Sequence, residues 1–231
     1  MIGDDDLANL LNEVHEVNNG KTLTYFEALT AAFFLGCMKY QNNIVLAEFG
    51  LFGRGDAVNI LKKNLANIVV SMSMDHESWL PENDRTIERI IYEKTSSLLK
   101  SNIIVAKQSS NKITECIKKN ISNNPANKIF HGEDYNFVLK ENDFFFYEDQ
   151  YGSLKIPKPN IKGDFQLENA STAIATIRIL KDLNIQDKHI IEGVKKAHNP
   201  ARLEEIKEGN LKDLVKAVSY THLRAHETVA N

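Results

Sequence analysis

The pattern of apolar and polar positions along the chain alternates between helical stripes and short apolar runs. Apolar residues three or four positions apart predict helices over residues 4–18, 23–40, 84–100, 111–121, 166–183 and 186–197. Compact apolar runs predict strands over residues 44–47, 66–72, 103–106, 128–130, 136–139, 144–147 and 153–156. The strands predicted up to residue 106 alternate with helices, whereas the four predicted between residues 128 and 156 follow each other closely and are expected to be antiparallel. The pattern therefore predicts an α/β fold, a mostly parallel sheet flanked by helices, with a small antiparallel β extension.

The strand predicted at residues 44–47 ends at a carboxylate, Glu48, and a glycine-rich loop follows. The loop contains three glycines and two charged residues: Gly50, Gly53, Arg54, Gly55 and Asp56. In an open α/β sheet ligands bind at the carboxyl ends of the strands, and glycines let the backbone approach them closely. Glu48 would then be a hard oxygen ligand for Mg²⁺, while the charged loop residues hold a polar substrate. The alternative interpretation is a strand followed by an ordinary turn with solvated charges.

Two further polar residues fall at positions that suit a site. His76 follows the strand predicted at residues 66–72, so it would share a sheet edge with Glu48 and offer a second metal ligand. Otherwise it is a solvated loop residue. Lys94 lies on the apolar stripe of the helix predicted at residues 84–100, where a cation is costly unless it is paired or neutralised. The alternative is that its stem packs while its ammonium reaches water.

Composition narrows the class of protein. The formal net charge of −3, with both signs interspersed, gives no basic footprint for nucleic acid or a membrane surface. No apolar run approaches the ~18 residues that a membrane span needs, and the acidic start of the chain does not resemble a signal peptide. Two cysteines are too few for a disulfide framework. These observations predict a cytoplasmic protein.

The glycine loop carries a family signature. Its matching residues, Glu48, Gly50, Leu51, Gly53 and Asp56, resemble a motif of the folylpolyglutamate synthase and dihydrofolate synthase family, within the Mur ligase superfamily. That motif is two apolar residues, Glu, any residue, Gly, an aliphatic residue, Gly or Ala, Gly, two free positions and Asp. Phe52 departs from it, because a small residue is usual there. The resemblance extends over most of the chain and implies the central α/β domain of a Mur-type ligase.

The resemblance also implies roles for individual residues. The residues implied to face a pteroate ring are Thr24, Tyr25, Phe26, Glu27, Gly55, Asp56 and Ala57. Phe26 is implied to stack on the flat pterin, although a capped helix with aromatic core residues explains the same segment. Glu48 and His76 are implied ligands of Mg²⁺, and Lys94, within Glu-Lys-Thr-Ser, is implied to be carbamoylated in support of the reaction. The residues implied to position ATP are Asn169, near the base or ribose, and Arg202, near a phosphate.

The activity implied by the resemblance is ATP-dependent amide formation. ATP would phosphorylate a carboxylate of dihydropteroate or folate, and the amine of L-glutamate would displace phosphate from the acyl phosphate. The cofactors implied are Mg²⁺ and ATP, the partners are these small molecules, and the protein is expected to be a monomer. Two alternatives stay open: another Mur-type amino-acid ligase, for example one acting on a cell-wall precursor, and a non-catalytic ligand-binding α/β protein.

Both ends of the chain depart from the family pattern. No Gly-x-x-x-x-Gly-Lys-[Ser/Thr] phosphate loop occurs, so we expect a fragment that is inactive as written. Residues 1–199 are expected to form a partial central domain, and residues 200–217 a hinge and the start of a truncated C-terminal domain. Residues 218–231 resemble one reading frame of a transposon-derived sequencing adapter and are expected to be a non-native tail.

Overall fold

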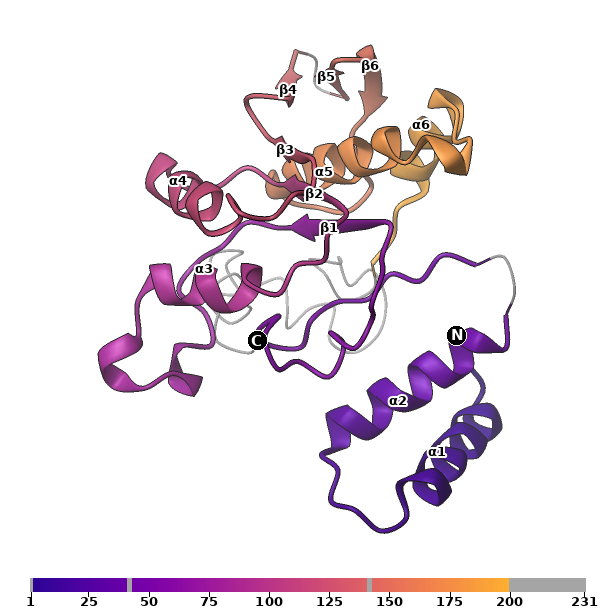
Figure 1. Cartoon of the computed structure of the whole chain (residues 1–231). Helices are drawn as coiled ribbons and strands as arrows, with labels where there is room; N and C mark the ends of the chain where they lie inside the picture. The colour runs from indigo at the N-terminus through magenta and orange to yellow at the C-terminus, as the bar shows by residue number, and fades with distance from the viewer. Residues whose placement is uncertain (1, 41–42, 141–142, 200–231) are drawn as a thin grey trace, which may run out of the picture. The chain divides into compact units, whose positions relative to one another are not determined.

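The structure is a computed structural model that describes residues 2–40, 43–140 and 143–199 (Figure 1). The chain divides into two compact units, Met1–Lys62 with Glu93–Ser97, and Lys63–Tyr92 with Leu98–Asn231. The hinge and the adapter-like tail predicted after residue 199 therefore lie outside the described residues.

A three-stranded parallel sheet forms the centre of the second unit. Its strands are β1 (Ala66–Val69), β2 (Asn102–Val105) and β3 (Lys128–Phe130), hydrogen-bonded in the order β1-β2-β3. Parallel neighbours need a crossover connection, which is usually a helix. The helices α3 (Ile87–Thr95) and α4 (Asn111–Asn120) lie in these connections. The predicted α/β fold is confirmed.

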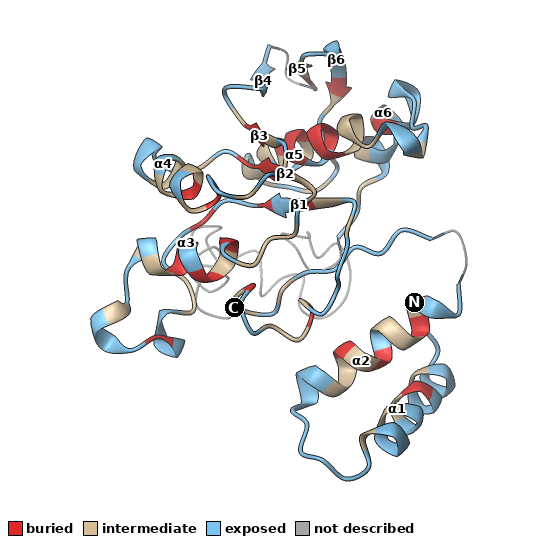
Figure 2. Cartoon of the chain, viewed as in Figure 1, coloured by how far each residue is buried: buried red, intermediate tan, exposed pale blue. Residues whose placement is uncertain are grey.

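Strand β2 is buried on both faces. Ile103, Ile104 and Val105 are at most 1% exposed. Ile103 and Val105 share one core with Ile91 of α3 and Ile117 of α4, while Ile104 belongs to a second core on the opposite face. Figure 2 shows buried residues in the strands and on one side of the neighbouring helices. The sheet therefore separates two apolar layers.

The antiparallel extension forms a sheet of its own. It contains β4 (Tyr135–Leu139), β5 (Phe144–Asp149) and β6 (Gly152–Pro157), in that order. The prediction that residues 128–130 belong to this extension is wrong, because β3 pairs in parallel with β2. Three residues carry no signal for strand direction. The crossover through α4 brings β3 back in the same direction as β2.

The aromatic run in β5 divides between the two faces of this sheet. Phe145 is fully buried, whereas Phe144 and Phe146 are partly exposed on the other face. There the Lys155 ammonium lies 4.4 Å from the centre of the Phe144 ring. The aromatic run therefore contributes core on one face of the sheet and partly exposed surface on the other.

Two helices complete the second unit, α5 (Phe165–Ile179) and α6 (Asp187–Lys196). The Arg178 guanidinium donates to both carboxylate oxygens of Asp149, over 2.8 and 3.1 Å, and to Asp187 over 3.0 Å. The side chains of Arg178 and Asp149 are 8% and 7% exposed. This nearly buried pair fixes the end of α5 to β5.

Two predicted helices are longer than the observed ones. The pattern predicted helix over residues 84–100 and 166–183, but α3 ends at Thr95 and α5 at Ile179. Three 3-10 turns lie close to these boundaries, at Glu77–Trp79, Glu82–Asp84 and Lys181–Leu183. After α3 the chain continues with two serines, whose side chains favour helix ends over helix interiors. None of the helices in the described ranges is long and apolar enough to cross a membrane.

The first unit contains a pair of helices, α1 (Asp4–Asn18) and α2 (Tyr25–Met38). A Cβ atom on Gly36 would lie 3.1 Å from Leu10 Cδ1, so the glycine permits close packing of the two helices. Residues 31–37 of α2 are nearly all apolar, a pattern that predicts a buried helix, yet Phe33 is 45% exposed. A single partner helix covers only one stripe of α2.

The strand predicted at residues 44–47 is not a strand in the structure. Ile44 and Leu46 are 61% and 85% exposed. An apolar run specifies burial, but a strand also requires a hydrogen-bonded partner. No described strand pairs with this segment.

We predict that His131 makes the second unit sensitive to acid. His131 follows β3, and its Nε2 atom is buried without a hydrogen-bond partner among the described residues. Burial lowers the pKa of His131 below 6.5, and the Lys107 ammonium lowers it further, against an opposing effect of Glu168. Below pH 6.5 the unfolded chain therefore takes up a proton that the folded chain resists, and stability falls as the pH falls.

The measurement is the melting temperature of wild type and His131→Phe between pH 8 and pH 5. Phenylalanine preserves ring contacts with Tyr135 and Phe137 and removes the titration. The wild type should lose more stability than the variant across the acid half of this range. Parallel curves for the two proteins would contradict the prediction.

Candidate functional site

The glycine loop is organised around the carboxylate of Asp56. Its Oδ2 accepts the backbone N–H groups of Gly50 (2.9 Å) and Leu51 (3.1 Å), and its Oδ1 accepts that of Val58 (2.9 Å). One side chain thus accepts hydrogen bonds from three backbone N–H groups that have no partner in a helix or sheet. The observed role of Asp56 is to hold the loop, and its predicted contact with substrate stays a prediction.

Gly53 lies where the loop packs most closely against the end of α3. A Cβ atom there would lie 2.7 Å from Ser97 Oγ, 2.9 Å from Phe49 Cε2 and 3.0 Å from the Lys94 carbonyl oxygen. The Gly53 carbonyl also accepts the side-chain amide of Asn59 over 2.7 Å. Glycine is required here because the backbone of the loop and the backbone of α3 approach each other directly.

Arg54 makes a two-pronged ion pair with Glu93. Its Nε and Nη2 atoms each lie 2.8 Å from a separate oxygen of the Glu93 carboxylate. The backbone N–H of Arg54 also donates to the Glu93 carbonyl over 3.1 Å. Glu93 is only 4% exposed. Arg54, interpreted from the sequence as a possible substrate contact, is therefore engaged with the protein itself.

The segment predicted to face a pteroate ring lies against this loop. A Cβ atom on Gly50 would lie 2.6 Å from Cζ of Phe26, so the aromatic ring rests on the Gly50 backbone. Phe26 is 43% exposed and Tyr25 is 81% exposed. The structure thus brings together two segments that the sequence predicted to share a site.

Thr24 and Glu27 form a capping box at the start of α2. The Thr24 hydroxyl accepts the Glu27 backbone N–H over 3.2 Å, and the Glu27 carboxylate accepts the Thr24 backbone N–H over 2.8 Å. The hydrogen bond from the Thr24 backbone lowers the pKa of Glu27. The capped-helix interpretation of this segment is confirmed, but Tyr25 is a surface residue and not part of a core.

Lys94 is partly buried near the end of α3, between the buried residues Glu93 and Thr95. The predicted stripe that joined Lys94 to Leu98 is wrong, because the helix ends at Thr95 and Leu98 lies beyond it. The backbone carbonyl of Lys94 nevertheless packs against the glycine loop, since a Cβ atom on Gly53 would lie 3.0 Å from its oxygen.

His76 and Glu48, the two predicted metal ligands, belong to different units. His76 has a left-handed backbone (φ 56°), and its Nδ1 lies 3.2 Å from Asp75 Oδ2. Glu48 is exposed. Within the described ranges no group of three or more His, Cys, Asp or Glu residues could hold a metal ion. The pairing of Glu48 with His76 stays a prediction.

Asn169 lies on a groove between α5 and α6. The groove has a volume of about 540 Å³ and a mostly apolar lining that includes Ala173, Ile177 and Ile190. The Asn169 side-chain amide donates to Gln166 Oε1 over 3.1 Å, at the same groove. Arg202, the other predicted ATP contact, lies outside the described residues.

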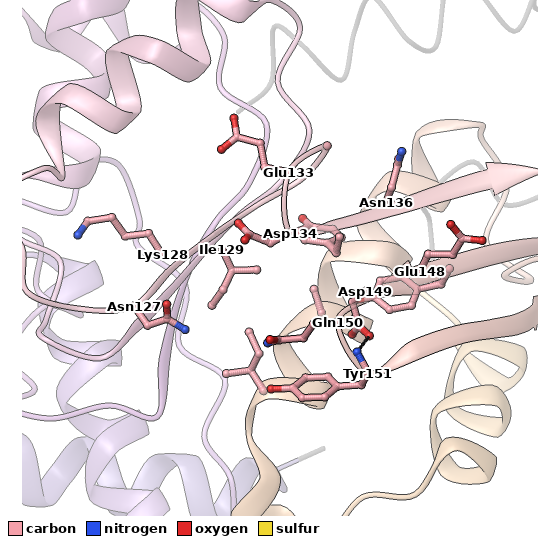
Figure 3. Close-up of a pocket in the computed structure, with 15 residues that line it drawn as sticks. Asn127, Lys128, Ile129, Glu133, Asp134, Asn136, Glu148, Asp149, Gln150 and Tyr151 are labelled. Carbon is pink, nitrogen blue, oxygen red and sulfur yellow. Dashed lines mark hydrogen bonds between the residues drawn. The ribbon is translucent and has the colours of Figure 1, made fainter.

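A second hollow, also of about 540 Å³, lies between β3 and the antiparallel sheet (Figure 3). Three of the four carboxylates along its wall have partners in the protein. Asp149 is held by Arg178, Glu133 lies 2.6 Å from the Lys118 ammonium, and Asp134 accepts a backbone N–H of β3 over 2.7 Å. None of the predicted site residues lines this hollow.

Two features of the site were missed by the sequence analysis. Glu93 was noted only as a neighbour of Lys94, although it falls three positions after the buried Ile90 and so on a buried side of the helix. A carboxylate at a buried helix position needs a cationic partner, and Arg54 in the loop was a candidate for it. This was the signal in the sequence that could have predicted the pair. The contact between Phe26 and Gly50 left no local signal, since 24 positions separate the two residues.

Comparison with known proteins identifies relatives of the chain. It is 28% identical to a dihydrofolate synthase/folylpolyglutamate synthase of Escherichia coli, over 85% of this chain and 44% of that protein. It is 26% identical to a probable dihydrofolate synthetase of Schizosaccharomyces pombe, over 78% of this chain and 43% of that protein. The chain thus spans less than half the length of these relatives. No protein-family model matches the chain.

Solved structures define the class of fold. A structure of E. coli FolC in complex with DHPP and ADP matches 90% of this chain and 47% of that chain, with a TM-score of 0.76 and 26% identity. The apo form of Lacticaseibacillus casei FPGS matches with a TM-score of 0.74 and 21% identity. The chain therefore has the α/β fold of the Mur-type ligases. Within that class its relatives are the folylpolyglutamate and dihydrofolate synthases, as the sequence motifs predicted.

We predict that Gly53→Ala lowers the free energy of unfolding by about 1 to 3 kcal/mol, because the added methyl group would crowd the Ser97 and Phe49 side chains and the Lys94 carbonyl of the helix backbone together. The matched control is Gly193→Ala in α6, where no atom lies within 4 Å of an added Cβ. That change should raise the free energy of unfolding by roughly 0.5 to 1 kcal/mol, since alanine favours helix. Urea denaturation followed by circular dichroism measures both. Equal effects of the two substitutions would contradict the predicted close contact.

Proposed function

We propose that this chain carries the central part of an ATP-dependent ligase that joins L-glutamate to dihydropteroate, folate or both. The observation that carries the proposal is the contact between the Phe26 ring and the Gly50 backbone. It brings the start of α2 and the glycine loop, two segments distant in sequence, to one place. The relatives named above support the same activity.

The proposed pteroate site consists of aromatic faces and loop backbone. Phe26 and Tyr25 keep exposed surface that a flat heteroaromatic ring can stack on. Gly55 has φ 75°, and no atom lies within 4 Å of an added Cβ, so the loop is open at this point. The proposed contacts of Asp56 and Ala57 are with the same ring system. Asp56 contributes by keeping the loop in shape.

The proposed site for the ATP base is the groove between α5 and α6. An apolar groove with a few polar groups suits a nucleobase. The Gln166 side chain orients the carboxamide of Asn169, which can recognise the edge of the base. Arg202 is proposed to reach a phosphate of the same nucleotide.

Glu48 and His76 are proposed to hold Mg²⁺. Two protein ligands suit this ion, which keeps several waters and takes further oxygens from phosphates. The Asp75 carboxylate lies 3.2 Å from Nδ1, so Nε2 is the His76 atom proposed to face the metal. When bound, Mg²⁺ would neutralise negative charge on the transferring phosphoryl group. Lys94 is proposed to act as a carbamate beside this site.

In the proposed reaction a substrate carboxylate attacks the γ-phosphorus of ATP, which forms an acyl phosphate and releases ADP. The amine of L-glutamate then attacks the acyl carbon, and phosphate leaves as the amide bond forms. The roles of the chain are to orient the pteroate ring and to position the nucleotide. A ligase for another carboxylate is disfavoured by the relatives, which are synthases of folates.

The test is isothermal titration calorimetry of the 231-residue chain with dihydropteroate. We predict measurable binding that Phe26→Ala weakens roughly 5- to 150-fold, since an aromatic stacking surface contributes about 1 to 3 kcal/mol per ring. Phe26→Leu should weaken binding less, because it keeps an apolar contact with Gly50. The matched control is Phe33→Ala, on the same helix and similarly exposed.

A reading frame that extends this segment to the length of its relatives would give the second readout. It should sustain ADP release over many turnovers only when both dihydropteroate and L-glutamate are present. Binding of ATP without any response to dihydropteroate would indicate a ligase for another substrate. Equal losses from Phe26→Ala and Phe33→Ala would argue against the proposed pteroate site.

A further inference from the structure

The pair formed by Arg54 and Glu93 joins the glycine loop to the end of α3 through three hydrogen bonds. Two run between the side chains at 2.8 Å, and the third runs from the Arg54 N–H to the Glu93 carbonyl at 3.1 Å. The Glu93 side chain is 5% exposed, whereas that of Arg54 is 55% exposed. Burial of an unpaired carboxylate would destabilise the folded protein, so Glu93 requires a cationic partner such as Arg54.

The residues on either side of this pair extend the same contact. Gly53, which precedes Arg54, packs directly on the Lys94 carbonyl and the Ser97 hydroxyl. Asn59 donates to the Gly53 carbonyl and so closes the far end of the loop. The backbone of the loop therefore packs against Lys94, the residue that follows Glu93.

We propose that Arg54 and Glu93 are positioning residues that hold the glycine loop in register with Lys94. This inference rests on the proposed function, because the loop is the proposed wall of the pteroate site. In this role Arg54 does not contact substrate. It keeps the backbone of Gly50 and Gly55 in the position from which it would contact the ring of the substrate.

Two features of the pair favour positioning over substrate binding. Both guanidinium atoms that face Glu93 are already engaged, in the planar geometry that matches a carboxylate. The neighbouring Asp56 is likewise engaged with loop N–H groups. Both charged side chains of the loop are thus directed to the protein. Lysine cannot reproduce the two parallel hydrogen bonds of arginine.

The first experiment measures amide hydrogen exchange of the loop in the 231-residue chain without ligand. Arg54→Lys and Arg54→Gln should each raise the exchange rate of the Gly50, Leu51 and Val58 amides by about 5- to 30-fold, the range expected when local stability falls by 1 to 2 kcal/mol. Unchanged exchange in Arg54→Gln would overturn the proposal. The matched control is Arg178→Lys, which breaks a similar two-pronged pair in the other unit and should leave the loop amides unchanged.

A double-mutant cycle guards against a general loss of folding. Arg54→Gln combined with Glu93→Gln should raise loop exchange no more than the more severe single change, because the two residues act through one contact. Additive effects of the two changes would overturn the pairing.

The second experiment measures dihydropteroate binding by calorimetry in wild type and Arg54→Lys. The dissociation constant should rise about 5- to 30-fold in the variant, in step with the loop exchange rate. Wild-type affinity in a variant whose loop exchanges faster would overturn the positioning role. Absence of dihydropteroate binding in the wild type, together with the expected exchange pattern, would refute the proposed function and leave the Arg54–Glu93 contact as a purely structural one.

Discussion

The burial of strand β2 on both faces is the constraint on which the second unit depends. Ile103 and Val105 point to one core, and Ile104 points to the other. A strand of this kind must be covered on both faces, and its parallel neighbours are reached through crossover connections, which are usually helices. The position of α3 and α4 in the chain follows from this requirement. The end of α3 carries Glu93 and Lys94, the two charged residues that lie against the glycine loop.

Polar groups inside the second unit satisfy the same constraint locally. The Tyr135 hydroxyl donates to the Val105 carbonyl over 3.1 Å, and burial raises the pKa of Tyr135 to about 12. The Arg178–Asp149 pair secures α5 to the antiparallel sheet. Each of these contacts joins elements that are distant in sequence. They specify how the second core is assembled, in addition to its apolar contacts.

The sequence predicts those features whose cause is local. The helical spacing of apolar residues and the short apolar runs located the helices and most strands to within a few residues. The residue types at Thr24 and Glu27 predicted a capped start of α2. The direction of β3 could not be predicted, since it depends on the crossover before it. The exposed run at residues 44–47 shows the same limit, because a strand is defined by its partner. For the site, family motifs found the loop, but the pairing of Arg54 with Glu93 depends on folding across 39 positions.

The candidate site illustrates why charged residues in a glycine loop are ambiguous from sequence alone. A loop with several glycines has large conformational freedom, and ordering it costs roughly 1 to 2 kcal/mol for each residue fixed. Asp56 and Arg54 offset part of this cost by binding backbone N–H groups and a buried carboxylate. Both charged side chains therefore already have partners within the protein, and these contacts order the loop before any ligand binds. What the prepared loop presents is backbone and the neighbouring aromatic faces of Phe26 and Tyr25, a surface suited to a flat ring rather than to a strongly charged group.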